Sequence, residues 1–397
     1  MNIVLKNANV ISMVSEEVLN NTDILIENDR IISVRQNIDG DQVIDCSGKY
    51  IIPGLADMHV HIDEASMTDM KLFVANGITN VRNMRGSENA LAMREKAKEK
   101  DLICPLIYTG TPILDGSPPV FPQNLVLETP EEARAYILKA KDEGYNFVKV
   151  YNNLTVSVYK EIIKTSKEAG LDVIGHIPVE VGAEMAIAEG QYCFEHVKAL
   201  KKEFLAPAAK AGVYFTPTLI VQEVVDWIKK DLITEEMYNS EITKYVSKDT
   251  LDKWREAVKI FRHHDFRLDR THEEYVADVK VFLDAGGMIL AGTDTQLPFC
   301  IYGFSLHDEL ERLSRSGISN YEILKAATII GAKCNHEEDE WGTIEPTKYA
   351  NLVILKDNPL QNIENTRSID AVVLKGNYYN RETLDGFLFE VAEGYKI

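Results

Sequence analysis

The chain has 397 residues, of which 45% are hydrophobic, enough to bury a large core in one barrel with an appendage or in two average domains. Its formal net charge of −19 argues against binding to nucleic acid or to an anionic membrane surface. The five cysteines are scattered without CxxC spacing, which favours free thiols in a reducing cytosol over a disulfide framework. The sequence has neither a signal-peptide pattern nor an apolar run of about 18 residues, so we expect a cytoplasmic protein.

Both ends of the chain have the pattern of β-strands. Residues 1–52 contain NIVLKNANVI, DILIENDRIISV and QVIDCSGKYIIP, separated by Asn, Asp and Gly turn residues. Strand-like runs return after about Trp341, as GTIEPTKYANLVILK and DAVVLKGNYYN. We therefore predict one small β-sandwich domain built from both termini, residues 1–52 and 345–397, with a second domain inserted between them.

Residues 53–344 alternate short apolar strands with amphipathic helices, the pattern of βα units around a parallel sheet. Eight strands with intervening helices predict a (β/α)8 barrel, in which active-site residues lie at the C-terminal ends of the strands. The predicted strands are residues 56–62, 78–84, 104–109, 146–151, 171–176, 192–197, 213–220 and 287–294.

Helix signals and one insertion complete the barrel pattern. Thr129, followed by Pro130 and Glu132, predicts a helix start, with the end at Gly144. Ser319 with Glu322 predicts another start, ahead of YEILKAATIIGAK. About 60 charged, helix-forming residues, 221–280, separate the last two strands, and an insertion of that length is typical of a lid or an oligomer contact. We expect a homo-oligomer.

Six polar residues lie in or at the end of these strands without an evident reason to be in a core. His59 and His61 are two residues apart, so both project from one face of a strand. Taken singly, each of the six has an ordinary reading as a core or surface residue. Six such coincidences at the ends of five strands are improbable, so we interpret the set as a metal site. The six residues are His59, His61, Lys149, His176, His196 and Asp294.

These residue types allow a binuclear centre. Alternation within NFVKVY directs Lys149 into the barrel, where burial lowers the pKa of its amine. A neutral lysine amine reacts with carbon dioxide to form a carbamate, an anionic ligand able to bridge two ions. Imidazoles and oxygens suit Zn or Mn, and two ions about 3.5–4 Å apart share a hydroxide and polarise a carbonyl. Asp294 would accept the proton as that hydroxide attacks and return it to the leaving amine.

Other residues are assigned by position. Tyr151 shares a face with Lys149 and is the candidate to hydrogen-bond the substrate, and Arg82 or Arg85 could hold a substrate carboxylate. Cys193 is interpreted as a core residue. The remaining histidines lack placement at a strand end and are interpreted as surface or structural: His263, His264, His272, His307 and His336.

Seven stretches extend over almost the whole chain, and the first four of them together with AGTDT form a specific combination. They are PGLADMHVH at 53–61, NGITNVRNM at 76–84, FVKVY at 147–151, GHIPVEVGAEMAIAEGQYCFEHV at 175–197, FTPTL at 215–219, AGTDT at 291–295 and GTIEPTKYANLVIL at 342–355. With these motifs the sequence resembles the amidohydrolase superfamily, in its imidazolonepropionase-like and Xaa-Pro dipeptidase-like branch. The resemblance implies the two-domain architecture with a composite β-sandwich and hydrolysis of an amide-type bond.

The resemblance also implies a ligand assignment with two ions, zinc being the expected metal. Carboxylated Lys149 would bridge them. The more buried ion would be held by His59, His61 and Asp294, and the other by His176 and His196.

Two departures from the family pattern concern the substrate. Arg82 is followed by Asn83, where relatives often have an acidic residue. Tyr151-Asn152-Asn153 stands where many relatives have Ser-Gly-Gly. Dipeptide specificity therefore cannot simply be transferred to this chain.

Three hypotheses follow. The first is a binuclear hydrolase of the amide of an N-acyl amino acid or a dipeptide. The second is a mononuclear cyclic-amide hydrolase or deaminase, with His196 polarising the substrate and Lys149 without a role. The third is an interaction protein that keeps the fold without catalysis, which should have lost ligands. In all three we expect neither a nucleic-acid nor a membrane partner.

Overall fold

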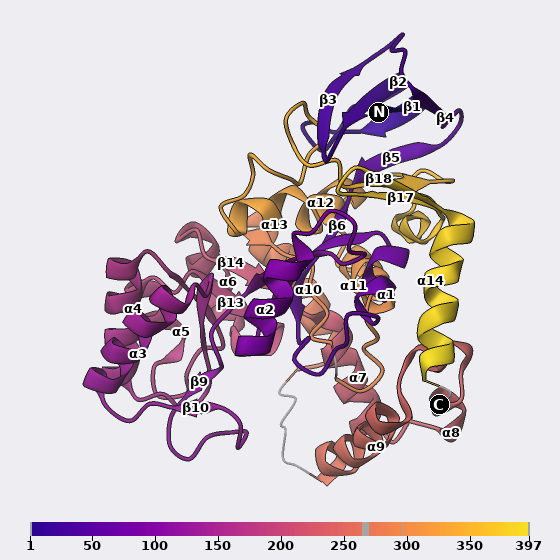
Figure 1. The fold of residues 1–397 in the computed structure, drawn as a ribbon. Coiled ribbons are helices and arrows are strands. Elements are labelled where there is room, and N and C mark those ends of the chain that lie inside the picture. Colours follow the sequence, from indigo (N-terminus) through magenta and orange to yellow (C-terminus); the bar gives the residue numbers. More distant parts are fainter. Residues whose placement is uncertain (1, 264–269, 296, 396–397) are drawn as a thin grey trace.

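The structure is a computed structural model that describes residues 2–263, 270–295 and 297–395. It contains the predicted (β/α)8 barrel and, at one end of it, a sheet formed by both chain termini (Figure 1). The predicted fold class is therefore confirmed. Among the described helices, none has the length and apolar character needed to cross a membrane.

The terminal domain is built on one eight-stranded sheet in the order β18-β17-β16-β5-β1-β2-β3, with β4 paired to β1. The two ends of the chain meet where β5 and β16 pair antiparallel, with Ile52 opposite Val353. Apolar side chains from both ends, among them Leu5, Ile51 and Leu352, form its core. The strands are β1 (Asn2–Ile11), β2 (Val18–Glu27), β3 (Arg30–Arg35), β4 (Gln42–Asp45), β5 (Tyr50–Pro53), β16 (Leu352–Leu355), β17 (Ile369–Leu374) and β18 (Asn377–Asn380).

Each barrel strand overlaps one of the eight predicted segments, although the seventh segment ends inside helix α7 (Leu219–Lys229) and the strand in the eighth covers only Met288–Ile289. The barrel strands pair in parallel in chain order, and the Gly110 to Phe147 bridge joins β8 to β11. The barrel closes where the Asp294 amide donates to the His59 carbonyl at 2.7 Å and Val60 bridges Thr295. The strands are β6 (Leu55–Val60), β7 (Ile78–Asn83), β8 (Leu106–Thr109), β11 (Phe147–Val150), β12 (Asp172–Gly175), β13 (Cys193–Glu195), β14 (Tyr214–Thr216) and β15 (Met288–Ile289).

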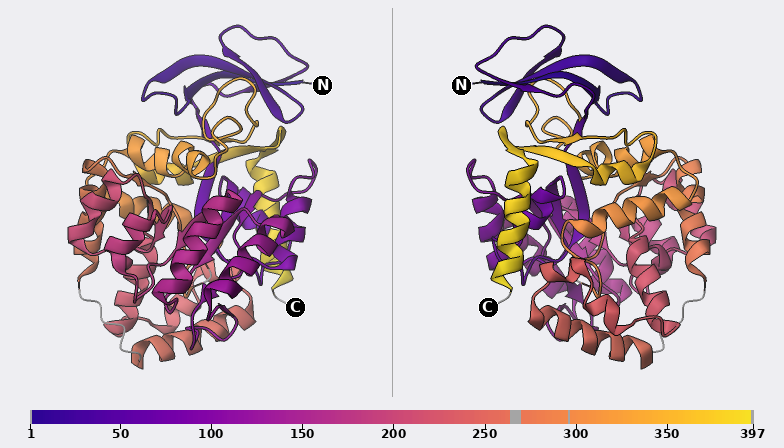
Figure 2. Two further views of the ribbon diagram at one scale, coloured as in Figure 1. Left: turned by 90° about the vertical axis from the view of Figure 1, so that its left-hand side faces the viewer. Right: turned by 90° about the vertical axis from the view of Figure 1, so that its right-hand side faces the viewer.

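Helices cover the outside of the barrel, and both views in Figure 2 show the terminal sheet at one end, with the C-terminal helix running along the barrel. Because β5 leads directly into β6, this sheet lies at the N-terminal ends of the strands, away from the expected active-site end. The covering helices are α1 (Met70–Ala75), α2 (Glu88–Ala97), α3 (Pro130–Glu143), α4 (Val156–Ala169), α5 (Gly182–Glu189), α6 (Lys202–Lys210), α10 (His272–Asp284), α11 (Phe304–Arg315) and α14 (Arg381–Gly394).

The two predicted helix starts are both present. Thr129 caps α3 with a complete capping box, and Gly144 ends the helix in the left-handed region at φ 85°. Ser319 caps α12 (Asn320–Ala326), but the following segment is two helices, because the backbone breaks at Thr328 before α13 (Ile329–Cys334). The break frees the carbonyls of residues 326 and 327 to accept barrel amides of residues 291 and 56, at 3.1 and 2.8 Å.

The insertion between β14 and β15 packs as a helical layer at the end of the barrel opposite the terminal sheet (Figure 1). Its aromatic contacts include Tyr238 and Trp254, whose rings lie 5.0 and 5.5 Å from that of Phe299 in the segment after β15. Whether it is a lid or an oligomer contact stays a prediction. Its elements are α7 (Leu219–Lys229), α8 (Glu235–Tyr238), η2 (Glu241–Tyr245) and α9 (Lys248–His263), and it continues into α10.

Glu309 ties this insertion to the barrel and gives the fold a pH dependence. Its buried carboxylate accepts the Leu219 and Ile220 amides of α7 at 2.9 and 2.8 Å. Burial raises the pKa of Glu309 from 4.5 to about 7. The folded protein therefore binds the Glu309 proton more tightly than the unfolded chain does. As the pH rises from 4.5 to about 7, the free energy of unfolding falls, by about 1.4 kcal/mol per unit of pKa difference.

We expect Glu309→Gln to remove this contribution. Between pH 4.5 and 7 the wild-type melting temperature should then decline more steeply than that of the variant. Melting curves of the two proteins across the range measure the difference. Parallel profiles would contradict the assignment.

Candidate metal centre

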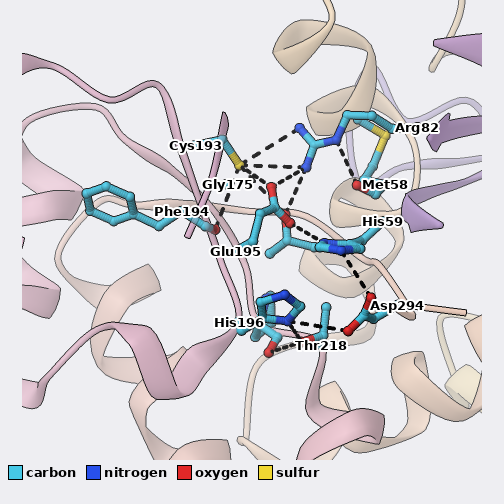
Figure 3. A network of polar contacts seen from close by, with 12 residues as sticks. Met58, His59, Arg82, Gly175, Cys193, Phe194, Glu195, His196, Thr218 and Asp294 are labelled. Carbon is cyan, nitrogen blue, oxygen red and sulfur yellow. Dashed lines mark hydrogen bonds and ion pairs between the residues drawn. The ribbon is translucent and has the colours of Figure 1, made fainter. Parts of the chain in front are cut away.

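The site at the C-terminal ends of the strands is centred on Asp294. Its Oδ1 lies 3.2 Å from His59 Nε2 and 3.1 Å from His61 Nε2. Its Oδ2 lies 3.9 Å from His196 Nδ1. His59 comes from β6, His196 follows β13, and Asp294 follows β15 (Figure 3). His61 lies just after the end of β6. Three of the predicted histidine ligands therefore converge on the carboxylate of a fourth predicted ligand, Asp294.

The remaining histidine joins the same group. The ring of His176, which follows β12, lies 4.7 Å from the ring of His196, and that ring lies 4.7 Å from the ring of His59. Ligand atoms of His59, His196 and Asp294 all lie within 4.8 Å of one another. Such a cluster of imidazole nitrogens and one carboxylate suits a Zn or Mn ion.

Lys149 reaches the same region from β11 and is only 1% exposed. Its Nζ has no hydrogen-bond partner among the described residues. Burial lowers the pKa of Lys149 to about 8, with Glu195 and Asp294 opposing that shift. Its chain runs close to Gly175, where an added Cβ would lie 3.2 Å from Lys149 Cδ. A buried, unpaired amine with a lowered pKa is the form that a carbamate-forming lysine needs.

Local backbone conformation brings Asp294 to the histidines. Asp294 has φ 55°, in the left-handed region. Two residues earlier, a Cβ on Gly292 would lie 2.6 Å from Thr216 Cγ2 and 2.9 Å from His59 Cβ, so only glycine permits this approach. Burial raises the pKa of the Asp294 carboxyl, but the neighbouring His59 and His196 outweigh it and hold that pKa well below its usual value.

Three of the imidazoles have a fixed partner at Nδ1. His176 Nδ1 lies 2.7 Å from Asn152 Oδ1, and His196 Nδ1 lies 2.8 Å from Thr218 Oγ1. His59 Nδ1 lies 2.6 Å from the Glu195 carboxylate. Metal-bound histidines characteristically donate their second N–H to such an oxygen, which leaves the Nε2 lone pair for the ion.

The position of the hydrogen on the His59 ring shows whether a cation fits the site. A carboxylate only accepts, so His59 Nδ1 carries the hydrogen and Nε2 has a lone pair. That lone pair lies 3.2 Å from Asp294 Oδ1, another acceptor. Nε2 is buried without a hydrogen-bond partner in the described part of the chain. Two acceptors this close need a proton or a metal cation between them, so the donor set fits a bound cation.

The position of Arg82 does not agree with its predicted contact to a substrate carboxylate. The side chain is fully buried on the inner side of His59. Its Nε donates to the Met58 carbonyl at 2.7 Å, and its Nη2 donates to Glu195 at 2.6 Å and to Thr216 Oγ1 at 3.1 Å. Because Arg82 is fully buried and hydrogen-bonded to other protein groups, it is not placed to contact a substrate.

Arg85 and Tyr151, in contrast, are partly exposed and lie beside histidines of the centre. The Tyr151 ring lies 4.0 Å from that of His176. Arg85 is a quarter exposed, with Nη1 3.4 Å from Asp63 and with its buried Nε unpartnered within the described ranges. Burial lowers the pKa of His61, and the positive charge of Arg85 adds to that shift. Both side chains are therefore placed to contact a bound molecule.

The other histidines agree with structural roles where the structure describes them. His307 is buried, 2.9 Å from Thr366 Oγ1 and 3.0 Å from the Asn76 carbonyl, and His336 bonds to Asp172 at 2.8 Å. His272 lies buried at the start of α10 and His263 ends α9, whereas His264 falls outside the described residues. Cys193 is fully buried, as predicted, and all five cysteines are free.

Sequence reasoning did not single out Glu195, Asn152 or Thr218, the Nδ1 partners. A signal existed for Glu195, which directly precedes His196 in a strand whose alternation points it inward with Cys193. Asn152 and Thr218 lie in loops, where no periodicity indicates direction.

Comparison with known proteins agrees with this fold and gives the family of the chain. The amidohydrolase family matches residues 50–378, and the chain belongs to that family. Among solved structures, a bottromycin amidohydrolase superposes with a TM-score of 0.81 at 20% identity, covering 99% of this chain and 90% of that one. A Xaa-Pro dipeptidase with bound methionine superposes with a TM-score of 0.75 at 19% identity, covering 96% and 100%. At these identities the likeness concerns the fold.

Curated relatives match over shorter segments. An adenine deaminase of Listeria innocua is 32% identical over 125 residues, which are 29% of this chain and 21% of that protein. A dihydroorotase of Pediococcus pentosaceus is 38% identical over 84 residues, 21% of this chain and 19% of that protein. The chain thus matches only about a fifth of the length of these relatives. Both names, like that of the dipeptidase, denote hydrolysis of a carbon–nitrogen bond.

Proposed function

We propose that the chain is a metal-dependent hydrolase of a carbon–nitrogen bond, acting on the amide of a small molecule such as an N-acyl amino acid or a dipeptide. The observation that carries this proposal is the convergence of His59, His61, His196 and Asp294, next to the unpaired amine of Lys149. Family membership supports the reaction class.

The residues divide the chemistry between them. Two divalent ions, with zinc as the first choice, would supply an activated water and polarise the scissile carbonyl. The histidines and carboxylated Lys149 would hold them. Asp294, whose carboxyl stays ionised because its pKa is held low, accepts the proton of the attacking water at a carboxylate oxygen and returns it to the leaving amine.

The surroundings of the site suggest what kind of amide enters it. The positive charge of Arg85 suits a carboxylate. The loop between β9 (Leu114–Asp115) and β10 (Leu125–Val126) presents Phe121, 38% exposed, with its ring 6.1 Å from that of Tyr151. A substrate with both a carboxylate and an apolar group matches these two features.

Asp115 holds this loop in place. Its buried carboxylate accepts from the amides of Gly116, Val120 and Asn153 at 3.0, 2.9 and 2.8 Å. Asn153 lies just after Tyr151, so the same carboxylate fixes the loop against the end of β11. Phe121 therefore lies on a loop whose backbone is held by the hydrogen bonds to Asp115.

Replacing Phe121 by alanine is expected to lower kcat/KM for substrates with a bulky apolar acyl group by about tenfold, the lower end of what one methylene contributes in a pocket. Acetyl analogues, which cannot reach the loop, should be hydrolysed as by the wild type. The ratio of the two rates is the measurement. An unchanged ratio would remove Phe121 from the substrate contact.

The function is tested by metal analysis together with a substrate panel. N-acyl amino acids, Xaa-Pro and other dipeptides, and lactams are offered to metal-loaded protein, and amine release is followed. We expect turnover that a chelator abolishes and added zinc or manganese restores. Absence of turnover across the panel by protein with its full metal content would refute the amide proposal.

A mononuclear deaminase or cyclic-amide hydrolase is the second candidate, favoured by the segments shared with an adenine deaminase and a dihydroorotase. It would use one ion and release ammonia from a heterocycle or open a ring. This second function gives the buried amine of Lys149 no role, so we place it below the amide hydrolase. One ion per chain and ammonia release from adenine would favour it.

The proposal includes a cytosolic location and a homo-oligomeric state. Five free, buried cysteines agree with a reducing compartment. The helical layer of α7 to α9 is the surface to examine for a subunit contact. Sedimentation of the purified protein decides the oligomeric state.

A further inference from the structure

Glu195 connects His59 to a buried arginine on the inner side of the centre (Figure 3). One carboxylate oxygen lies 2.6 Å from His59 Nδ1, and the other lies 2.6 Å from Arg82 Nη2. All three residues are 0% exposed. The three side chains form a hydrogen-bonded, charged network enclosed within the barrel, and His59 is its one candidate metal ligand.

Arg82 is itself fixed, so Glu195 cannot swing away from His59. Its Nε donates to the Met58 carbonyl at 2.7 Å, and Nη2 also donates to Thr216 Oγ1 at 3.1 Å. Met58 directly precedes His59 in β6. The same guanidinium thus holds both the backbone beside the ligand and the carboxylate that orients its ring.

Within the part of the chain that the structure describes, no other imidazole of the centre has a carboxylate hydrogen-bonded to its Nδ1. His176 and His196 donate to the neutral oxygens of Asn152 and Thr218. His61 Nδ1 has no hydrogen-bond partner in the residues that the structure describes. A hydrogen bond to a carboxylate is roughly twice as strong as one to a neutral oxygen, and it makes the imidazole a more basic ligand. His59 is therefore the imidazole built to bind most strongly.

We propose that Glu195, held by Arg82, is a positioning residue that sets the affinity of the His59 side of the centre for its metal ion. It fixes the tautomer in which His59 Nε2 faces Asp294, and it strengthens that nitrogen as a donor. Arg82 balances the carboxylate, which would otherwise be a buried unpaired charge. This inference rests on the proposed metal-dependent function.

The test is calorimetric titration of zinc into metal-free protein. For Glu195→Gln, which keeps the shape and removes the charge, we expect the affinity of the tighter ion to fall by about 10- to 100-fold. The matched control is Asp23→Asn in the terminal sheet, where an equally enclosed carboxylate accepts the amides of Asn7 and Ile38 at 2.9 Å. It should bind zinc as the wild type does.

A second comparison separates metal affinity from folding. Arg82→Met leaves Glu195 buried and unpaired, so its melting temperature should fall markedly. The double variant Arg82→Met/Glu195→Gln removes both charges and should recover most of that temperature, while its zinc affinity stays low.

Two results would overturn the inference. One is wild-type affinity in Glu195→Gln; the other is a double variant in which affinity returns together with the melting temperature. Wild-type protein that binds no zinc at all would instead refute the proposed function, and this inference with it.

Discussion

Replacing Lys149 by methionine is expected to abolish most of the activity, lowering kcat/KM by on the order of a thousandfold. The carbamate would hold two metal ions that stabilise the developing negative charge by several kcal/mol, and each 1.4 kcal/mol is about a factor of ten. Methionine has nearly the length of lysine and suits the buried path past Gly175. Metal content should fall below two ions per chain together with activity.

A second variant and a metal-reloading experiment test whether the carbamate, and not the lysine cation, is required for activity. Lys149→Arg keeps a cation but cannot react with carbon dioxide, so it should be as inactive as Lys149→Met. Wild-type protein made metal-free and reloaded without carbon dioxide should regain activity slowly, and bicarbonate should accelerate the recovery. A Lys149→Met enzyme with near wild-type activity would end the bridging proposal.

Asp294→Asn is the change with the second largest expected effect. The amide keeps the shape of the side chain, but it cannot accept the proton of the attacking water, so kcat should fall by about 10²- to 10⁴-fold. Because the histidines remain, the protein should still bind metal, with weaker affinity. Kinetics at full metal loading, checked by elemental analysis of the same sample, provide the measurement.

Comparison with His61→Ala gives this test its control. His61 is a candidate ligand without a proposed proton-transfer role, so excess metal should restore part of the activity of His61→Ala. Excess metal should restore little activity to Asp294→Asn. Equal recovery of both variants would reduce Asp294 to a metal ligand and remove it as the proton acceptor.

Much of the fold was predictable because the physical signals are local and repeated. Eight short apolar strands with intervening helices give a parallel barrel with few alternatives, and its geometry places strand ends together. His59 and His61 were therefore predicted to lie near Asp294, although more than 230 residues separate them in the sequence. The caps at Thr129 and Ser319 were equally local signals.

The predictions were wrong where the surrounding structure, and not the local sequence, decides what a residue does. An arginine near a predicted active site suggests a carboxylate contact, and nothing in the sequence shows that Arg82 lies beneath His59 with Glu195 as its partner. The break at Thr328 has a similar cause, because barrel amides donate hydrogen bonds to carbonyls that would otherwise accept bonds within a continuous helix. Tertiary hydrogen bonds, not local preference, decide both cases.

The substrate side was the least predictable part. Phe121 lies in a loop, and its proximity to Tyr151 depends on how Asp115 holds the β9–β10 loop. Arg85 lies just after the end of β7. Alternation in a strand gives the direction of a side chain, but a loop has no such period.

The metal content of protein purified without added metal tests the central claim most directly. Elemental analysis should find close to two divalent ions per chain in the wild type, and clearly fewer in a variant in which His59 and His196 are both replaced by alanine. A wild-type protein that contains no metal, and takes none up after zinc or manganese is supplied, would contradict the account.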